Sequence, residues 1–271
     1  RKNKHAGVRE GLPAGDENMK EPLKKMVIGS LAMVALTAGH VQAQESMLEF
    51  EFEASVDIAA KYVWRGFLLT DDPVIQPGFT VAYGDLAFNI WGNIDTTDIN
   101  ENGVDEDYRI QEIDYTLSYG FSPSDSVDME VGIIRYDFPG TPLDSTTEVY
   151  ASATWNVLLA PTLTVYYDID ESDGLYVNGS IGHTFELTEA LGLSLGASLA
   201  WGDDDNNEFY YGVDDNGIAD VMLSGSLDYA VNDNFGISFY LGYSEIIDSD
   251  LEDALADSDV FNGGINFTYS F

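Results

Sequence analysis

Cysteine is absent from this sequence, and basic residues are scarce. Without cysteine the chain cannot be held together by disulfides, nor can it use thiolates as metal ligands or nucleophiles. The 271 residues contain 11 Lys and Arg against 48 Asp and Glu. Such an excess of negative charge argues against nucleic acid as a partner and for cations, either dissolved or bridging anionic lipid headgroups.

Beyond residue 43 the chain also lacks any apolar run long enough to span a bilayer as a helix. Residues 1–18 contain no Met, and we expect them to be extra sequence upstream of the start. Residues 19–43 have three lysines, then a short apolar run, then a cleavage-like site at Ala43, as in an export signal. We therefore expect a signal peptide cleaved after Ala43, with residues 44–271 as the mature chain. A retained N-terminal anchor is the alternative, disfavoured by the short run and the cleavage-like site.

A two-residue period dominates the mature chain. In its last run, apolar side chains alternate with small or polar ones from Phe261 to the final residue, Phe271. This alternation is typical of a strand with one apolar and one polar face, and no helix has it. An aromatic residue at the end of such a strand resembles the C-terminal segment of bacterial outer-membrane β-barrels, where it serves as an insertion signal.

Twelve alternating segments can be counted, the first from Phe50 to about Trp64. Five short turns and six mostly long, acidic connections alternate between them. This alternation, with aromatic residues near the strand ends, fits an even-stranded barrel better than a soluble sandwich. An open sheet edge in lipid would leave backbone groups unpaired, so the sheet has to close. We predict an all-β fold, a transmembrane antiparallel up-and-down β-barrel of about 12 strands with both termini periplasmic.

The polar faces of these strands are expected to line the barrel interior. They carry mostly carboxylates, which are tolerated in a wet lumen but costly against acyl chains. The predicted pore-lining residues are Lys61, Arg65, Glu112, Asp114, Asp128, Glu130, Glu148 and Asp168. The two bases are expected in the extracellular half of the first strand, paired with acids across from or beside them. Arg109 and Arg135 are expected near strand ends, where they can reach the headgroups.

Two interpretations of this interior stand side by side. In a water-filled lumen the carboxylates would concentrate cations and reject anions. In a barrel too narrow to conduct, salt bridges and hydrogen bonds would fill the same space. Twelve strands lie between the packed 8-stranded barrels and the open 16-stranded porins. Glycines at inward positions, among them Gly182, Gly196 and Gly242, favour the aqueous pathway.

Acidic connections raise the question of calcium. Residues 168–174 and 203–208 are rich in Asp, but neither has the register of an EF-hand. A solvated surface is the favoured interpretation, and we predict no cofactor and no metal site.

Two other functional classes remain open. Some outer-membrane barrels are lipid hydrolases that use a Ser and a His on the wall, and His183 is the one histidine of the predicted mature chain. A nucleophile needs a base within reach and a group that orients it, and no such set is evident around His183. A non-conducting structural or surface-binding barrel is the other class, with the long connections at 202–218 and 246–259 as its interaction sites.

Several short motifs are similar to those of one family. They are Tyr62-Val63-Trp64-Arg65-Gly66, residues 73–79, Ile90-Trp91-Gly92-Asn93, Glu112-Ile113-Asp114 and Thr147-Glu148-Val149-Tyr150. Together they resemble the TorF-type porin family, although Pro77 departs from the glycine or small residue of its pattern. The resemblance implies a barrel in the outer membrane of a Gram-negative cell, surrounded by lipid and lipopolysaccharide. We therefore predict a porin for passive diffusion of small hydrophilic solutes, with a preference for cations or neutral solutes.

Overall fold

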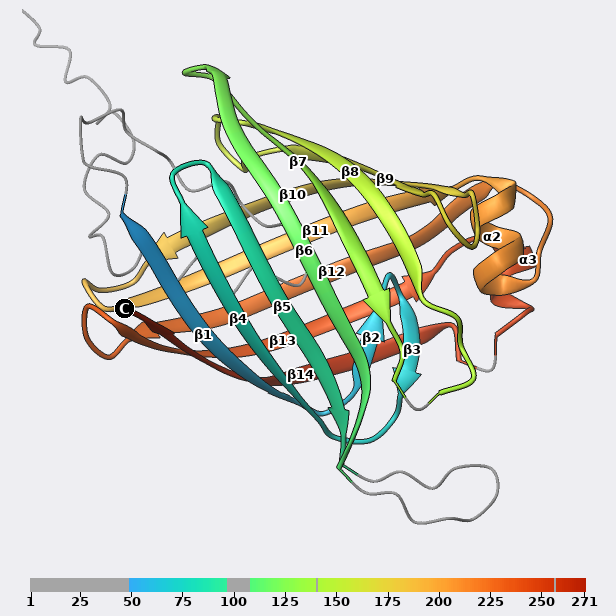
Figure 1. The fold of residues 1–271 in the computed structure, drawn as a ribbon, viewed down its shortest axis with the longest axis horizontal. Helices are drawn as coiled ribbons and strands as arrows, with labels where there is room; N and C mark the ends of the chain where they lie inside the picture. Colours follow the sequence, from blue (N-terminus) through green and yellow to red (C-terminus); the bar gives the residue numbers. More distant parts are fainter. Residues whose placement is uncertain (1–48, 97–107, 140, 256) are drawn as a thin grey trace, which may run out of the picture.

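The computed structural model describes residues 49–96, 108–139, 141–255 and 257–271. Within these ranges twelve strands form one closed antiparallel barrel (Figure 1), which confirms the predicted fold class. The predicted upstream segment and signal peptide lie outside the described residues. The periplasmic position of the termini stays a prediction.

The barrel strands follow one another in chain order around the ring. They are β1 (Phe50–Ala59), β4 (Val74–Tyr83), β5 (Leu86–Asp95), β6 (Arg109–Ser124), β7 (Val127–Asp137), β8 (Thr146–Trp155), β9 (Thr162–Asp168), β10 (Leu175–Glu186), β11 (Leu191–Gly202), β12 (Gly217–Ala230), β13 (Phe235–Ile246) and β14 (Asp259–Ser270). β1 pairs with β4 on one side and with β14 on the other, so the ring closes between its first and last strands. Just past the end of β14, Phe271 exchanges two backbone hydrogen bonds with Phe52, at 2.9 and 3.2 Å. The closed ring leaves no sheet edge unpaired.

Large apolar side chains cover the outer face of this ring. On β12, Leu223, Leu227 and Tyr229 are exposed, whereas Asp220 and Asp228 are fully buried on the opposite face. Apolar side chains outside and carboxylates inside invert the arrangement of a water-soluble protein and suit a barrel surrounded by lipid. Among the described residues, no helix combines the length and the apolar character needed to cross a bilayer.

The two ends of the barrel differ. Figure 1 shows the C terminus and the start of β1 at one end, termed the terminal end, and two short helices at the other, termed the loop end. Connections at the terminal end are short, like the turn at Gly84 and Asp85 between β4 and β5. At the loop end, α2 (Asp204–Tyr211) and α3 (Ser249–Glu252) lie within longer connections. The predicted alternation of short and long connections is therefore confirmed in the described part of the chain.

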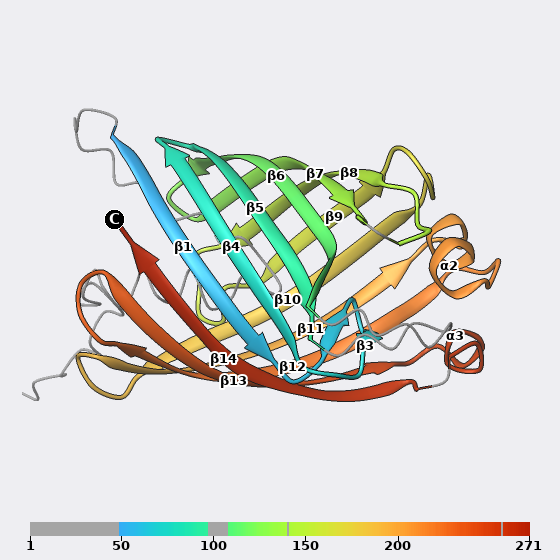
Figure 2. The same ribbon diagram turned by 60° about the horizontal axis from the view of Figure 1, so that its bottom comes forward.

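The first strand is shorter than predicted. β1 ends at Ala59, and β2 (Tyr62–Trp64) and β3 (Phe67–Thr70) form a separate two-stranded sheet. Figure 2 shows this pair near the loop end, between the walls of the barrel. The prediction of one strand to Trp64 was wrong because an alternating pattern continues unchanged when a chain leaves one sheet and enters another. Residues 60–73 are termed the inner hairpin.

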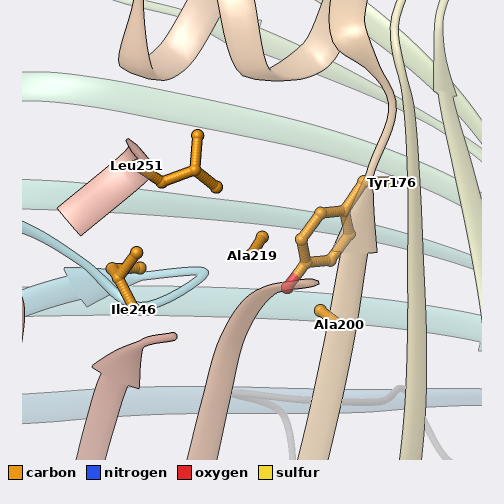
Figure 3. Close-up of a cluster of buried hydrophobic side chains, with 5 residues drawn as sticks. All are labelled: Tyr176, Ala200, Ala219, Ile246 and Leu251. Atoms are coloured by element: carbon orange, nitrogen blue, oxygen red, sulfur yellow. The ribbon is translucent and has the colours of Figure 1, made fainter. Parts of the chain in front are cut away.

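A small apolar core lies at the loop end. Its buried members are Tyr176, Ala200, Ala219, Ile246 and Leu251 (Figure 3). They come from four neighbouring barrel strands and from α3, and partly buried Tyr211 of α2 packs against them. Burial of a leucine-sized side chain contributes roughly 1.5–3 kcal/mol. These contacts therefore hold both helices against the end of the barrel.

Candidate functional site in the barrel lumen

The inner hairpin turns at Arg65 and Gly66. Trp64 pairs with Phe67 across the turn, and the two central residues have φ values of 47° and 79°. Positive φ at both positions defines a type I′ turn, which matches the twist of a hairpin and in which Asn-Gly is favoured. For a residue other than glycine, this left-handed backbone costs roughly 1–2 kcal/mol. The contacts of the Arg65 side chain offset that cost.

Arg65 reaches the opposite wall of the barrel. Its Nη1 and Nη2 donate hydrogen bonds to Oε1 and Oε2 of Glu148 at 2.9 and 2.7 Å. Its Cζ lies 4.3 Å from the ring centroid of Trp64, 4.6 Å from that of Tyr166 and 4.3 Å from that of Tyr176. Glu148, Trp64, Tyr166 and Tyr176 are termed the Arg65 cage. β8, β9 and β10 lie halfway round the ring from β1 and β4, so the hairpin spans the lumen.

Both charges of this ion pair are shielded from solvent. The side chain of Arg65 is 11% exposed and that of Glu148 is 3% exposed. Burial is the largest single influence and by itself would lower the pKa of Arg65, but the charge and hydrogen bonds of Glu148, together with Tyr136 and Tyr210, more than offset it, and the pKa lies well above its ordinary value. The guanidinium therefore stays charged. Each partner depends on the other, because an unpaired buried charge costs several kcal/mol.

The other side of the hairpin tip rests against β12 and β13. A Cβ atom on Gly66 would lie 2.7 Å from Cβ of Asp220 and 2.8 Å from Cδ1 of Ile246. Tyr176 donates its hydroxyl hydrogen to Oδ2 of Asp220 at 2.7 Å. Among the described residues, Oδ1 of Asp220 is buried without a hydrogen-bond partner. Only glycine therefore fits at position 66. The carboxylate oxygen beside it is costly to leave without a hydrogen bond.

Aromatic rings enclose the rest of the hairpin. The ring of Trp64 packs edge-on against Tyr136 of β7, with 6.4 Å between the ring centroids, and at a tilt against Tyr210 of α2, with 5.0 Å between the centroids. Phe67 packs against Tyr211 of α2 with a centroid distance of 4.8 Å. An alternating strand that continued to Trp64, as predicted, would place this side chain on the outer face with the other apolar residues. That is wrong because Trp64 lies on β2 and not on a wall strand. The signal that could have shown the turn is the glycine directly after Arg65, followed by a second apolar run.

Lys61 lies at the base of the hairpin. Its Nζ is 2.5 Å from Oδ1 of Asp71, and its backbone N–H donates to Oδ1 of Asn262 at 3.1 Å. Because Asp71 is exposed, this pair contributes little, about 0–1 kcal/mol. Lys61 and Arg65 each pair with an acid, as expected, but they do so from the hairpin and not from the first wall strand.

Two predicted carboxylates face the hairpin from β6. Glu112 is buried and interacts with Tyr62 of the hairpin and with Asp114 on its own strand. Oδ1 of Asp114 is buried, and among the described residues it has no hydrogen-bond partner. These two acids and Glu148 are the predicted residues that the structure brings to the hairpin.

The remaining predicted carboxylates lie farther along the wall. Glu130 accepts a hydrogen bond from the hydroxyl of Tyr150 at 2.7 Å. Asp168 accepts one from Thr146 at 2.6 Å and two from backbone N–H groups of the following loop, at 2.8 and 3.0 Å. Asp128 is buried near the terminal end of β7. Their role as pore-lining residues stays a prediction.

Arg135 ends in a surface network. It donates hydrogen bonds to Asp137 at 3.1 Å, to Asp170 at 2.9 Å and to Thr147 at 3.0 Å. Its side chain is 43% exposed, and β7 ends close by at the loop end. Arg135 is thus ion-paired as Arg65 is, but it lies outside the lumen and is exposed to solvent.

His183 is not part of a hydrolase-like set in the described chain. Its ring meets Phe185 edge-on at 4.6 Å. The hydroxyl of the adjacent Thr184 is hydrogen-bonded to Ser194 at 2.9 Å. A nucleophile activated by His183 would need a hydroxyl paired with that ring.

Asp203, Asp204 and Asp205 can bring carboxylate oxygens within 4.8 Å of one another. Asp203 already has a structural role, because its Oδ1 accepts hydrogen bonds from the backbone N–H groups of Asn206 and Leu175, both at 2.9 Å. This caps the start of α2. The cluster is therefore explained by helix capping and exposed surface.

A closed antiparallel barrel with an apolar outer face and a carboxylate-rich interior is an outer-membrane type of β-barrel. The family described as MltA-interacting protein MipA matches residues 71–271, which is most of the chain. The protein therefore belongs to the MipA family. No curated protein matches the chain by sequence.

Solved structures share the fold. An outer-membrane channel from Pseudomonas putida F1 is 8% identical, with 86% of this chain and 98% of that chain covered and a TM-score of 0.50. The KdgM porin (10% identical, 82% and 99% covered, TM-score 0.48) and the NanC porin (10% identical, 82% and 99% covered, TM-score 0.45) are more distant in shape. At these identities the likeness concerns the fold alone. The TorF-type label stays a prediction.

Proposed function

We propose that this protein is an outer-membrane channel through which small hydrophilic solutes diffuse passively, and that the inner hairpin closes it in the conformation described. The observation that carries the proposal is a carboxylate-rich barrel interior spanned by a short hairpin attached at one side. In this proposal the apolar belt faces outer-membrane lipid and lipopolysaccharide, and both termini are periplasmic.

Small inward side chains support an aqueous path on the terminal side of the hairpin. Ser224 lies on the same face of β12 as Asp220 and Asp228, and it is exposed even though it points into the barrel. It pairs with Gly196 on β11, and its Oγ lies over this glycine, where a Cβ atom would come within 2.6 Å of it. Water-exposed hydroxyls at mid-height are expected of a wet lumen and not of a packed one.

Charge supports a preference for cations or neutral solutes. Glu112, Asp114 and Glu130 face the interior, whereas Lys61 and Arg65 are each paired with an acid. A path lined mainly by carboxylates attracts cations and repels anions.

Single-channel recording in a planar bilayer under a KCl gradient tests this function. The informative variant replaces residues 62–70 with a Gly-Ser linker of equal length, and a control replaces residues 142–144, which are exposed in the connection between β7 and β8, in the same way. We expect a larger conductance in the first variant and a reversal potential that shows cation preference. A folded linker variant that does not conduct would contradict the channel, and anion preference would contradict the selectivity.

A non-conducting barrel that binds a partner protein is the second candidate. The closed loop end favours it, because the inner hairpin, α2 and the core around Leu251 occupy that end. The name of the family describes an interaction with MltA, and an interaction of that kind is a proposal for this chain. We propose no enzymatic role, and an acyl-ester hydrolysis that is lost in His183→Ala would contradict this.

A further inference from the structure

We propose that the Arg65 cage is a binding site for solutes that bear a guanidinium or primary amine group. In the conformation described, the guanidinium of Arg65 occupies the place of the solute's cationic group. The inference rests on the proposed channel function and names the class of solute that would open the lumen by replacing Arg65.

Most of the cage belongs to the barrel wall. Glu148, Tyr166 and Tyr176 lie on β8, β9 and β10, which are held by continuous strand pairing. The hydroxyl of Tyr136 donates a hydrogen bond to Oε2 of Glu148 at 2.9 Å and orients this carboxylate. Trp64 alone comes from the hairpin. Three of the four groups would therefore keep their positions if the hairpin moved aside.

The chemistry of the cage suits a cation, and a planar one best. A carboxylate that accepts two parallel hydrogen bonds matches the fork of a guanidinium, and the aromatic faces attract its positive charge. A primary ammonium can use the same carboxylate and ring faces with fewer hydrogen bonds. A neutral or anionic solute has no means of replacing the buried charge of Arg65.

Asp220 offers a further hydrogen-bond acceptor that Arg65 does not use. Its Cβ lies beside the position of Gly66, and its buried Oδ1 lacks a hydrogen-bond partner among the described residues. If the hairpin tip left, the pocket would contain two carboxylates near one set of rings. This favours a solute with further hydrogen-bond donors beyond its first cationic group.

Exchange explains why such a solute could move the hairpin. Departure of Arg65 alone would leave the carboxylate of Glu148 buried without its partner, which is strongly unfavourable. An incoming cation restores the pair, so one guanidinium replaces another. The fraction of molecules with the hairpin docked reduces the apparent affinity of the solute. A variant without Arg65 should therefore bind more tightly than the wild type.

The test is isothermal titration calorimetry of the full-length mature barrel in detergent micelles with methylguanidinium chloride. Arg65→Asn removes the guanidinium, and asparagine suits the first position of a type I′ turn. We expect saturable one-to-one binding to R65N and at least about tenfold weaker binding to the wild type. Glu148→Gln in the R65N background should abolish binding. Arg135→Asn, which removes a guanidinium outside the lumen, should bind as the wild type does.

Two further arms separate the outcomes. The linker variant at residues 62–70 empties the cage in a different way, and circular dichroism establishes which variants are folded. If R65N or the linker variant folds but shows no saturable binding of methylguanidinium, the cage is not a binding site and the proposal is overturned. Binding without conductance would retain the cage and overturn the channel, whereas conductance without binding would retain the channel and overturn the cage.

Discussion

Gly66 of the inner hairpin and Asp220 of β12 touch so closely that the contact leaves no room for a methyl group. A Cβ atom on Gly66 would lie 2.7 Å from Cβ of Asp220. The glycine is needed both for its positive φ and for this approach to the wall. Together with the Arg65–Glu148 ion pair, this contact holds the tip of a short hairpin inside the lumen.

Gly66→Ala should therefore displace the hairpin tip. The added methyl group combines backbone strain of roughly 1–2 kcal/mol with a direct overlap at the wall. We expect the bond after Arg65 to become sensitive to trypsin, measured by limited digestion and mass spectrometry of the products. Gly212→Ala is the matched control, because Gly212 also has a positive φ, 72°, but nothing lies within 4 Å of its added Cβ. Equal resistance of both variants would contradict the tight fit.

Removal of both hairpin bases should raise cation preference. Lys61→Ala combined with Arg65→Ala leaves Asp71 and Glu148 without their basic partners, so the path becomes more negative. The measurement is the reversal potential of single channels under a KCl gradient, with Arg135→Ala as a control outside the lumen. Unchanged selectivity would mean that the two bases lie outside the conducting path.

Adjacent residues on β12 provide a test of the inward and outward faces. Leu223 is 52% exposed on the outer surface, and Ser224 points into the barrel. Leu223→Arg should lower the free energy of unfolding by about 2–4 kcal/mol, the cost of a lipid-facing base near mid-height. Ser224→Arg should change it little. Denaturant titration of the protein in lipid vesicles compares the two, and a reversed order would contradict the assigned faces.

The apolar core at the loop end should control the order of α3. Leu251 is 1% exposed, and Leu251→Ala should cost about 2–5 kcal/mol of local stability. We expect faster amide hydrogen exchange in the residues around 247–253, with β7 unaffected. Leu143→Ala is the matched control, since Leu143 is 62% exposed. Slow exchange in both variants would show that the helix is held by other contacts.

The wall of the barrel could be predicted because its signal is local. Along β8, Glu148 and Tyr150 alternate with Val149, and the outward residue is apolar while the inward ones are polar. Closure follows from the need to pair every backbone group in lipid. A two-residue period therefore suffices to assign both the strand and the face of Glu148.

The candidate site could not be predicted in the same way. Arg65 and Glu148 are 83 positions apart, and no local pattern indicates that they meet. The alternation through Tyr62 and Trp64 also reads as a continuation of the first strand. Only the packing of the hairpin against the far wall shows that these aromatic side chains lie inside. Long-range contacts of this kind depend on the three-dimensional path of the chain.

The position of the inner hairpin in the chain has a consequence for assembly. Residues 60–73 precede every wall strand that surrounds the hairpin tip, and the ring closes only when β14 reaches β1. The wall around the hairpin tip is therefore complete only after the hairpin has been synthesised, so the docked hairpin depends on strands that come later in the chain. Contacts between segments this far apart carry a large entropy of loop closure and slow the search for the native state. Glu148, the acid that binds Arg65, is accordingly synthesised after it, and the ion pair can form only once β8 is present.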